Sequence, residues 1–249
     1  MKIKLLLSLT CFVFIMSFNV LSLNGQASFD LETGAVATGY NNVRIPGDEG
    51  TLFSLKDDLI SKTEFFFRLR ANYTIKSRHT LSLLYAPLET VSKGNVTYDI
   101  LFEGVTFPAN TDLTGTYKFN SYRFTYRYEI VLKPEFEFGL GFTAKIRDAK
   151  IAMASARQES EKTNVGFVPI INFRILWKPY EKFGVLLEGD ALAAPQGRAE
   201  DVLIAATYRI SDRLGLKAGY RILEGGADND EVYNFALFNY AAAGILIYL

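Results

Sequence analysis

Cysteine and histidine are almost absent from this sequence. The 249 residues include one cysteine and one histidine. The cysteine, Cys11, lies in an N-terminal apolar stretch that we expect to be removed on export. The remaining chain then has no thiol, no disulfide and no cysteine chemistry.

An excess of one charge is also missing. Lysine and arginine number 27, and aspartate and glutamate number 27. Without a strongly basic balance, the chain lacks the electrostatic footprint of a nucleic-acid-binding protein. Its 49% hydrophobic and 14% aromatic content excludes a disordered polymer.

Residues 1–27 have the pattern of a secretory signal. Lys2 and Lys4 provide a basic start, residues 5–23 an apolar stretch, and Gly25 and Ala27 a small-residue cleavage site. We expect cleavage after Ala27, which leaves one domain over residues 28–249. An uncleaved signal anchor is the alternative.

No uncharged apolar run after residue 27 approaches the roughly 20 residues that a transmembrane helix needs. A secreted chain of this kind is a periplasmic β protein, an outer-membrane barrel or an α/β protein. Many segments instead alternate apolar and polar residues with a period of two, which predicts β-strands. We predict ten strands: residues 29–39, 62–75, 81–88, 122–130, 136–145, 165–177, 185–193, 202–210, 214–222 and 233–249.

The predicted connections alternate in length. Short links at 76–79, 133–134, 178–182 and 211–213 separate longer links at 41–61, 91–116, 152–162, 194–200 and 224–231. An even strand number, with both termini on the short-turn side, is typical of bacterial outer-membrane barrels. Eight or twelve strands remain open, because Pro87 and Pro169 fall within predicted strands and residues 95–117 have the alternation of an extra hairpin.

The distribution of charge over the two strand faces favours a membrane barrel. In the six clearest strands, the apolar face contains no charged residue, whereas the other face contains the charges and several glycines. A water-soluble barrel has the reverse arrangement. The apolar face therefore belongs against lipid, and Trp177, Tyr180 and Phe183 at one turn fit the headgroup level.

On these residues the chain resembles the bacterial outer-membrane β-barrel proteins over essentially the whole of its mature length. The resemblance implies an all-β, antiparallel, transmembrane up-and-down barrel in the outer membrane, with lipid and the barrel-assembly machinery as partners. Such barrels often end in a strand that the assembly machinery recognises. Gly244, Ile247 and Leu249 match the spacing of that signal, although Leu249 stands where an aromatic residue is usual.

The polar face points into the lumen of the predicted barrel. A barrel of eight to ten strands is about wide enough to be filled by its side chains, so buried charges must pair. The register places Arg127 opposite Gly139 or Gly141, and Arg209 opposite Gly215. The predicted lumen network comprises Arg68, Arg70, Arg123, Arg127, Glu129, Glu137, Lys145, Arg174, Glu188, Asp190, Arg209, Lys217 and Arg221, with Asp30, Glu32, Glu64 and Asp201 as further inward-facing acids.

No residue pattern indicates catalysis or a cofactor. His79 falls at a predicted periplasmic turn, whereas outer-membrane proteases and lipid-modifying enzymes carry a catalytic histidine on the barrel wall or outer rim. Glu188 and Asp190 share a face, and we expect a salt bridge to Arg174 rather than acid–base chemistry. The acidic loop clusters lack the spacing of a calcium loop. We therefore expect a non-catalytic barrel with a closed lumen and surface loops for structural or binding roles. A narrow pore for small solutes is the alternative, and an outer-membrane enzyme is a further one.

Overall fold

A computed structural model describes residues 25–195 and 197–249. Most of the predicted signal segment, including Cys11, lies outside these residues. Strand β1 begins at Gly25, so the predicted cleavage position after Ala27 falls within its first residues. The described ranges contain no helix that is long and apolar enough to cross a membrane.

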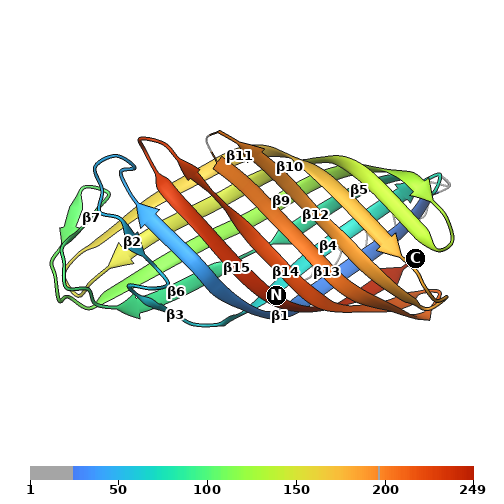
Figure 1. Cartoon of the computed structure of the whole chain (residues 1–249), viewed down its shortest axis with the longest axis horizontal. Helices are drawn as coiled ribbons and strands as arrows, with labels where there is room; N and C mark the ends of the chain where they lie inside the picture. Colours follow the sequence, from blue (N-terminus) through green and yellow to red (C-terminus); the bar gives the residue numbers. More distant parts are fainter. Residues whose placement is uncertain (1–24, 196) are drawn as a thin grey trace, which may run out of the picture.

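The described residues form a closed antiparallel barrel of ten strands, as predicted. The strands that form the wall are tilted relative to the barrel axis (Figure 1). Pairing of β1 with the C-terminal strand β15 closes the barrel. In chain order the wall is built from β1 (Gly25–Arg44), β4 (Glu64–Ile75), β5 (His79–Ala86) continued by β6 (Glu89–Gly94), β9 (Leu113–Leu132), β10 (Phe136–Ala154), β11 (Glu159–Trp177), β12 (Phe183–Ala194), β13 (Gly197–Ser211), β14 (Leu214–Asp228) and β15 (Tyr233–Tyr248).

The two ends of the barrel differ in their connections. The short turns 76–78, 133–135, 178–182 and 212–213 lie at the end where β1 begins and β15 ends. The opposite end carries the long segments 45–63 and 87–112, which include the short strands β2 (Phe53–Ser54), β3 (Ile60–Ser61), β7 (Ile100–Phe102) and β8 (Val105–Phe107). In outer-membrane barrels the short turns face the periplasm.

Most strands extend further toward the loop end than the sequence predicts. Strand β9, predicted over 122–130, spans Leu113–Leu132. The expected long loops 152–162, 194–200 and 224–231 are therefore mostly strand, and their connections shorten to 155–158, 195–196 and 229–232. The prediction was wrong because the extensions of β11, β13 and β14 are rich in polar residues and glycine, which weakens the alternation that marks a strand. The extensions of β9 and β10 do carry apolar lumen-facing residues, including Leu113, Ile151 and Met153.

The two prolines that fall within predicted strands, Pro87 and Pro169, lie where a strand lacks a full set of partners. Pro87 separates β5 from β6, which both pair with β9 and act as one interrupted strand. Pro169 lies in β11, two residues beyond the last residue paired with β12, Ile171. One edge of β11 is free from there on, so the missing N–H of proline is tolerated.

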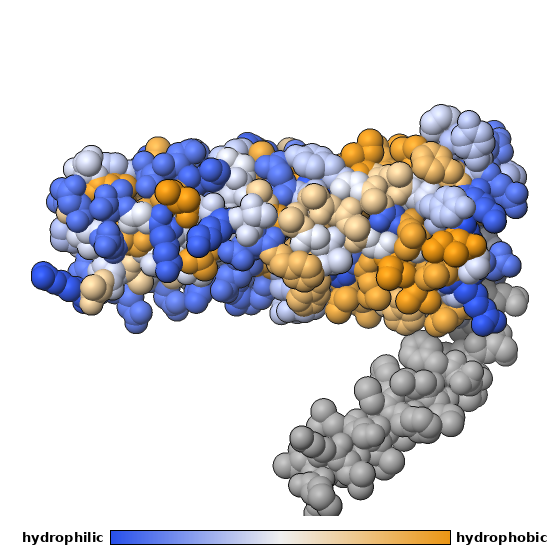
Figure 2. Space-filling view, turned by 90° about the horizontal axis from the view of Figure 1, so that it is seen from below, coloured by the Kyte–Doolittle hydropathy of each residue, from blue (hydrophilic) through white to orange (hydrophobic). Residues whose placement is uncertain are grey.

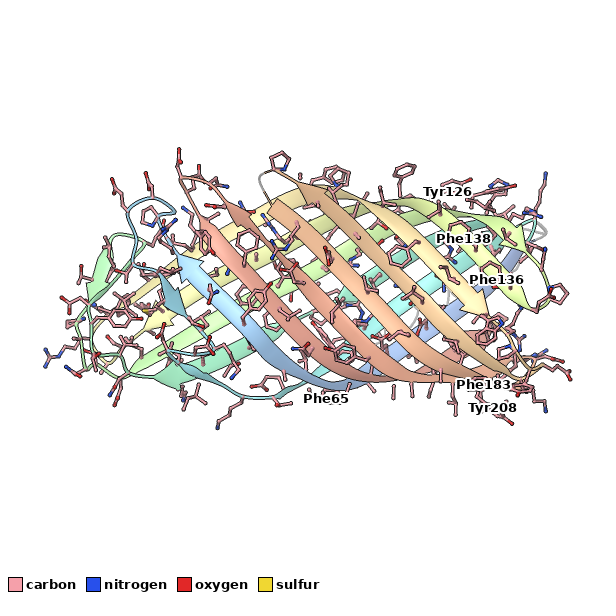
Figure 3. The ribbon with its side chains drawn as sticks, viewed as in Figure 1. Phe65, Tyr126, Phe136, Phe138, Phe183 and Tyr208 are labelled. Atoms are coloured by element: carbon pink, nitrogen blue, oxygen red, sulfur yellow. The ribbon has the colours of Figure 1, made fainter. Side chains whose placement is uncertain are left out.

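The outer surface carries an apolar belt in the half of the barrel next to the short turns. Figure 2 shows this half largely orange, whereas the half next to the loops is mostly blue and white. Labelled aromatic side chains of the belt point outward from the wall (Figure 3). Two of the most exposed, Phe65 and Phe142, leave 76% and 73% of their surface uncovered. The belt fits a bilayer, and the polar half projects beyond it.

The loop end of the lumen is filled by apolar side chains. Strands β7 and β8 form a hairpin that hydrogen-bonds to the first long segment, from Leu101 to Thr51 and from Glu103 to Ile45. The sequence predicts an extra hairpin here, and it lies against the lumen rather than apart from it. We call the following buried side chains the apolar cap: Val43, Ile45, Phe53, Leu55, Leu59, Ile100, Phe102, Phe107, Leu113, Ile151 and Met153.

Candidate functional site

Below the apolar cap, charged side chains from most strands meet in the centre of the lumen. We call this set the charge layer and define it as Glu32, Arg68, Arg123, Asp190, Asp201, Lys217 and Arg221. Each residue is buried, at 5% exposure or less. Their positions follow from strand alternation, because every second residue of a barrel strand faces inward.

Asp201 on β13 is the central acceptor of the charge layer. One of its oxygens, Oδ1, lies 2.5 Å from Nη1 of Arg221. The other, Oδ2, accepts from Nη2 of Arg68 at 2.9 Å and from Nη2 of Arg123 at 2.6 Å. Three guanidinium groups therefore share one carboxylate, which neutralises charge that would otherwise be buried at high cost.

Asp190 extends the layer toward β10 and β11. Its Oδ2 atom accepts from Nη1 of Arg123 at 2.6 Å. Its Oδ1 atom accepts from the Thr143 hydroxyl at 2.6 Å and from the Asn172 amide at 2.9 Å. Both oxygens of a fully buried carboxylate are thus hydrogen-bonded, as such groups require.

Glu32 and Lys217 complete the layer on the side of β1 and β14. Lys217 Nζ lies 2.6 Å from Glu32 Oε2 and 2.8 Å from Asp30 Oδ2. Glu32 also accepts two hydrogen bonds from Arg221. On the short-turn side, Arg70 bonds Glu188 at 3.0 Å.

Further buried apolar side chains, among them Phe66, Leu223 and Tyr240, belong to the same apolar cluster as the cap and lie next to the charge layer. A small cavity of about 10 Å³ lies there and is lined by these three residues and by Arg68 and Arg123, among others. That volume is about the size of one water position. The ring centroids of Phe66 and Tyr240 lie 4.8 Å apart and seal the apolar side.

The lumen widens between the charge layer and the short turns. A cavity of about 620 Å³, which we call the vestibule, is lined by Arg70, Arg127, Glu129, Glu137, Arg174 and Arg209, among others. Arg127 Nε bonds Glu129 Oε1 at 2.8 Å. Glu137 accepts from Arg174 at 2.8 Å and from Lys178 at 2.6 Å.

Two predicted register relationships are confirmed. Arg127 pairs with Gly141, and Arg209 pairs with Gly215. Arg174 does pair in register with Glu188, yet the expected salt bridge of Glu188 and Asp190 to Arg174 is wrong. Glu188 bonds Arg70 across the lumen, and Asp190 bonds Arg123. Glu188 and Asp190 each pair with an arginine on a strand that is not a neighbour, and the register between adjacent strands does not determine such pairs.

Three residues of the predicted network form no ion pair within the described part of the chain. Lys145 is buried with its Nζ 4.6 Å from the centre of the Phe119 ring. Arg209 lies at the vestibule rim, with its guanidinium 4.4 Å from the centre of the Tyr248 ring. Glu64, at the start of β4, is only half-buried.

The sequence interpretation missed the uncharged members of the lumen. Thr125, Thr143 and Asn172 support Asp190 or one another, and no charge marks them. Phe66 and Tyr240 were also missed as lumen-sealing residues. Phe66 stands on the polar face of its strand, between Glu64 and Arg68, and that exception to the alternation was the available signal.

Other predicted residues lie away from the lumen network. His79 begins β5 at the short-turn end, where its Nδ1 atom is 2.9 Å from the Tyr126 hydroxyl and its ring packs on Tyr128. Gly244 faces the lumen within β15, Ile247 pairs with Phe29, and Leu249 follows the strand. Within the described ranges, no three histidine, cysteine or acidic side chains gather as metal ligands.

A polar cluster lies at the outer rim, beyond the apolar belt. The Tyr40 hydroxyl donates to Glu224, which also binds Arg198 Nη2 at 2.8 Å. Burial, and then the carboxylate of Glu224, raise the pKa of Tyr40 above its ordinary value. The cluster joins β1, β13 and β14 at the loop end.

The arrangement of strands can be compared with solved structures. Over 93% of this chain and 99% of its own length, the outer membrane protease OmpT of Escherichia coli superposes with a TM-score of 0.56 at 10% sequence identity. This chain has the fold of the bacterial outer-membrane β-barrels. That fold and the apolar belt indicate the bacterial outer membrane.

Other outer-membrane barrels superpose less closely. The attachment invasion locus protein Ail of Yersinia pestis gives a TM-score of 0.42 at 11% identity over 89% of this chain and 99% of its own. The translocator domain of the autotransporter NalP of Neisseria meningitidis gives 0.43 at 9% identity over 93% and 91%. No protein-family model and no curated protein sequence matches the chain.

Proposed function

We propose that this outer-membrane barrel is non-catalytic and closed, and that its loop end serves structural or binding roles. The observation that carries the proposal is the filling of the lumen by two successive layers. The apolar cap lies at the loop end, and the charge layer lies directly below it. Because the side chains of both layers are buried, we expect hydrated ions and solutes to find no path between them.

The charge layer also supports a closed lumen because its groups bind one another. Arg123 and Arg221, which a conducting path would have to pass, are each held by two carboxylates at 2.5 to 2.8 Å. A selectivity filter needs charged groups that are free to exchange water for a solute. Here the acceptors are already occupied by the protein's own donors.

The positions of the acidic residues and the histidine support a non-catalytic role. Glu188 is bonded to Arg70, and Asp190 is bonded to Arg123. His79 lies on the outer surface beside Tyr126 and Tyr128, apart from both carboxylates. General acid–base catalysis requires such groups within hydrogen-bond reach of a common substrate.

The loop end offers the surface for binding. Residues 45–63 and 87–112 fold over the lumen as the cap, and their outer side includes the exposed side chains of Leu52 and Ile60. The polar halves of the strands below this surface project beyond the apolar belt (Figure 2). A partner outside the cell would meet these parts first.

A liposome-swelling assay tests the closed lumen against the alternative of a narrow solute pore. Purified protein is reconstituted into liposomes, which are diluted into isosmotic arabinose or glycine beside protein-free liposomes. We expect the same light-scattering trace from both preparations. Swelling that increases with the amount of folded protein would overturn the closed lumen in favour of the narrow pore.

A further inference from the structure

The vestibule is a deep pocket rather than part of a channel. It opens at the short-turn end, and its inner limit is formed by Asp30, Arg70 and Glu188. Ion pairs of Asp30 with Lys217 and of Glu188 with Arg221 join this limit to the charge layer. Its volume of about 620 Å³ falls in the range of small-molecule sites. The proposed closed lumen does not assign it a role.

The vestibule has two unlike walls. Strands β4, β5, β9, β10 and β11 present charged and polar side chains, including Arg127 and Arg174. The facing wall, from the end of β11 to β15, presents three leucines beside Glu188, Thr207 and Arg209; the leucines are Leu176, Leu186 and Leu246. A pocket that offers both charged groups and an apolar surface suits a molecule that has a charged head and an apolar body.

Two glycines lie between the two arginines of the charged wall. Strand β10 separates β9 from β11, and at this level its lumen-facing residues are Gly139 and Gly141. Gly141 pairs with Arg127 on one side, and Gly139 pairs with Arg174 on the other. A β-carbon on Gly139 would lie 2.5 Å from Glu129 Oε2 and 2.9 Å from Arg127 Cδ, so glycine leaves the room that these two side chains use.

Arg127 has donors that the protein does not use. Its side chain is nine-tenths buried and bonds Glu129 only through Nε. Within the described residues, its two terminal nitrogens donate no hydrogen bond. Arg174 bonds Glu137 through Nη1 alone. The lining carries six cationic against five acidic residues. Glu129 Oε2 and Asp30 Oδ1 also lack a partner, so the anion has to be bound by the free guanidinium nitrogens, away from these two oxygens.

We propose that the vestibule binds a small, water-soluble, amphipathic anion that enters from the short-turn side. Its carboxylate or phosphate head binds the unused guanidinium nitrogens of Arg127 and Arg174, because guanidinium groups pair with the oxygens of such heads at two points. Its apolar body packs on Leu176, Leu186 and Leu246. The assignment requires the vestibule to be accessible and does not depend on conduction.

The binding test uses 4-fluorophenyl phosphate as the probe. Wild-type protein in nanodiscs of zwitterionic lipid is titrated into the probe, and fluorine NMR line width reports binding against empty nanodiscs. We expect saturable binding that weakens about tenfold or more in Arg127→Gln, since a hydrogen bond to a charged group is lost. Arg213→Gln, which removes the same charge from an exposed turn at the same end, should change the affinity less than twofold.

Competition separates the two halves of the assignment. Inorganic phosphate should displace the probe only at about tenfold or higher concentration than unlabelled phenyl phosphate, because it lacks the apolar body. Equal affinity in wild type and Arg127→Gln would overturn the anion site. Equal competition by inorganic phosphate would overturn the role of the leucine wall. The heat-modifiable mobility of each variant on SDS gels verifies that the barrel has folded.

Discussion

Arg221 on β14 and Glu32 on β1 form a two-point ion pair across the intervening strand β15. Nε and Nη2 of the arginine lie 2.8 and 2.9 Å from the two carboxylate oxygens. Both side chains are buried, and Arg221 also binds Asp201. Replacing buried ion pairs by apolar groups is often neutral, whereas removing one partner leaves an uncompensated charge.

Arg221→Ala should therefore destabilise the barrel strongly. Glu32 and Asp201 would each lose a buried partner, and the expected loss is about 3–5 kcal/mol of the free energy of unfolding. Urea titration in lipid vesicles, followed by tryptophan fluorescence, measures it. Arg213→Ala at the exposed turn is the matched control, with an expected change within about 0.5 kcal/mol. A loss below about 1 kcal/mol for Arg221→Ala would show that the charge layer is not as tightly closed as described.

Replacing Gly244 should destabilise the barrel because an added side chain lacks room there. A β-carbon there would lie 2.7 Å from the Leu31 carbonyl oxygen and 2.8 Å from Cε of Lys217. We expect Gly244→Ala to cost about 1–3 kcal/mol through this overlap. Gly215→Ala on the neighbouring strand is the control, because its nearest contact would be an ordinary 3.5 Å.

The same pair of variants addresses the predicted assembly signal. If Gly244 acts only through the assembly machinery, Gly244→Ala refolded in vitro should be as stable as Gly215→Ala. Lower stability after in vitro refolding, measured by urea titration as above, supports the packing role. The roles of Ile247 and Leu249 in assembly remain predictions.

The position of the apolar belt predicts that the destabilisation caused by an outward-facing arginine depends on its depth in the bilayer. Phe124 and Asn120 both point outward from β9, and only Phe124 lies within the belt. Arginine at a mid-bilayer position of a barrel costs about 2–4 kcal/mol, and near the interface about 0–1 kcal/mol. Phe124→Arg should therefore reduce stability in vesicles by several times more than Asn120→Arg. Equal losses would place the bilayer elsewhere on the barrel.

Alkaline pH should loosen the apolar cap. The Tyr98 hydroxyl donates to Asp58, which links the two long segments, and burial together with this carboxylate raises the pKa of Tyr98 to about 12. Because the folded pKa exceeds the ordinary value, the contribution is complete below about pH 10 and is lost as the pH rises toward 12. The difference in absorbance at ~295 nm between wild type and Tyr98→Phe reports ionisation of Tyr98 and should titrate near pH 12. Titration near the ordinary tyrosine pKa of ~10 would contradict the hydrogen bond to Asp58.

The sequence determines the wall of this barrel better than its contents. Alternation and link lengths predicted ten strands and the outward face, because each depends on neighbours along the chain or across one turn. The register rule likewise placed Arg127 opposite glycine. The strand extensions toward the loop end, several of which are rich in polar residues and glycine, were not predicted.

Contacts across the lumen could not be derived from the sequence. Arg68 and Asp201 are 133 residues apart and sit on strands that are not neighbours, so no register relates them. The apolar cap depends on how residues 45–63 and 87–112 fold over the opening. Their apolar residues fit a loop hairpin outside the barrel equally well by pattern alone.

The central claim is that two layers in series close the lumen, and single-channel recording in planar bilayers tests it most directly. The wild type, a variant with residues 46–62 and 95–112 each replaced by a Gly–Ser linker, and Glu32→Ala/Arg221→Ala should each be silent, because one layer remains. The combined variant should conduct, which shows that the assay detects an opened barrel. Stable current steps from the wild-type protein would contradict the account.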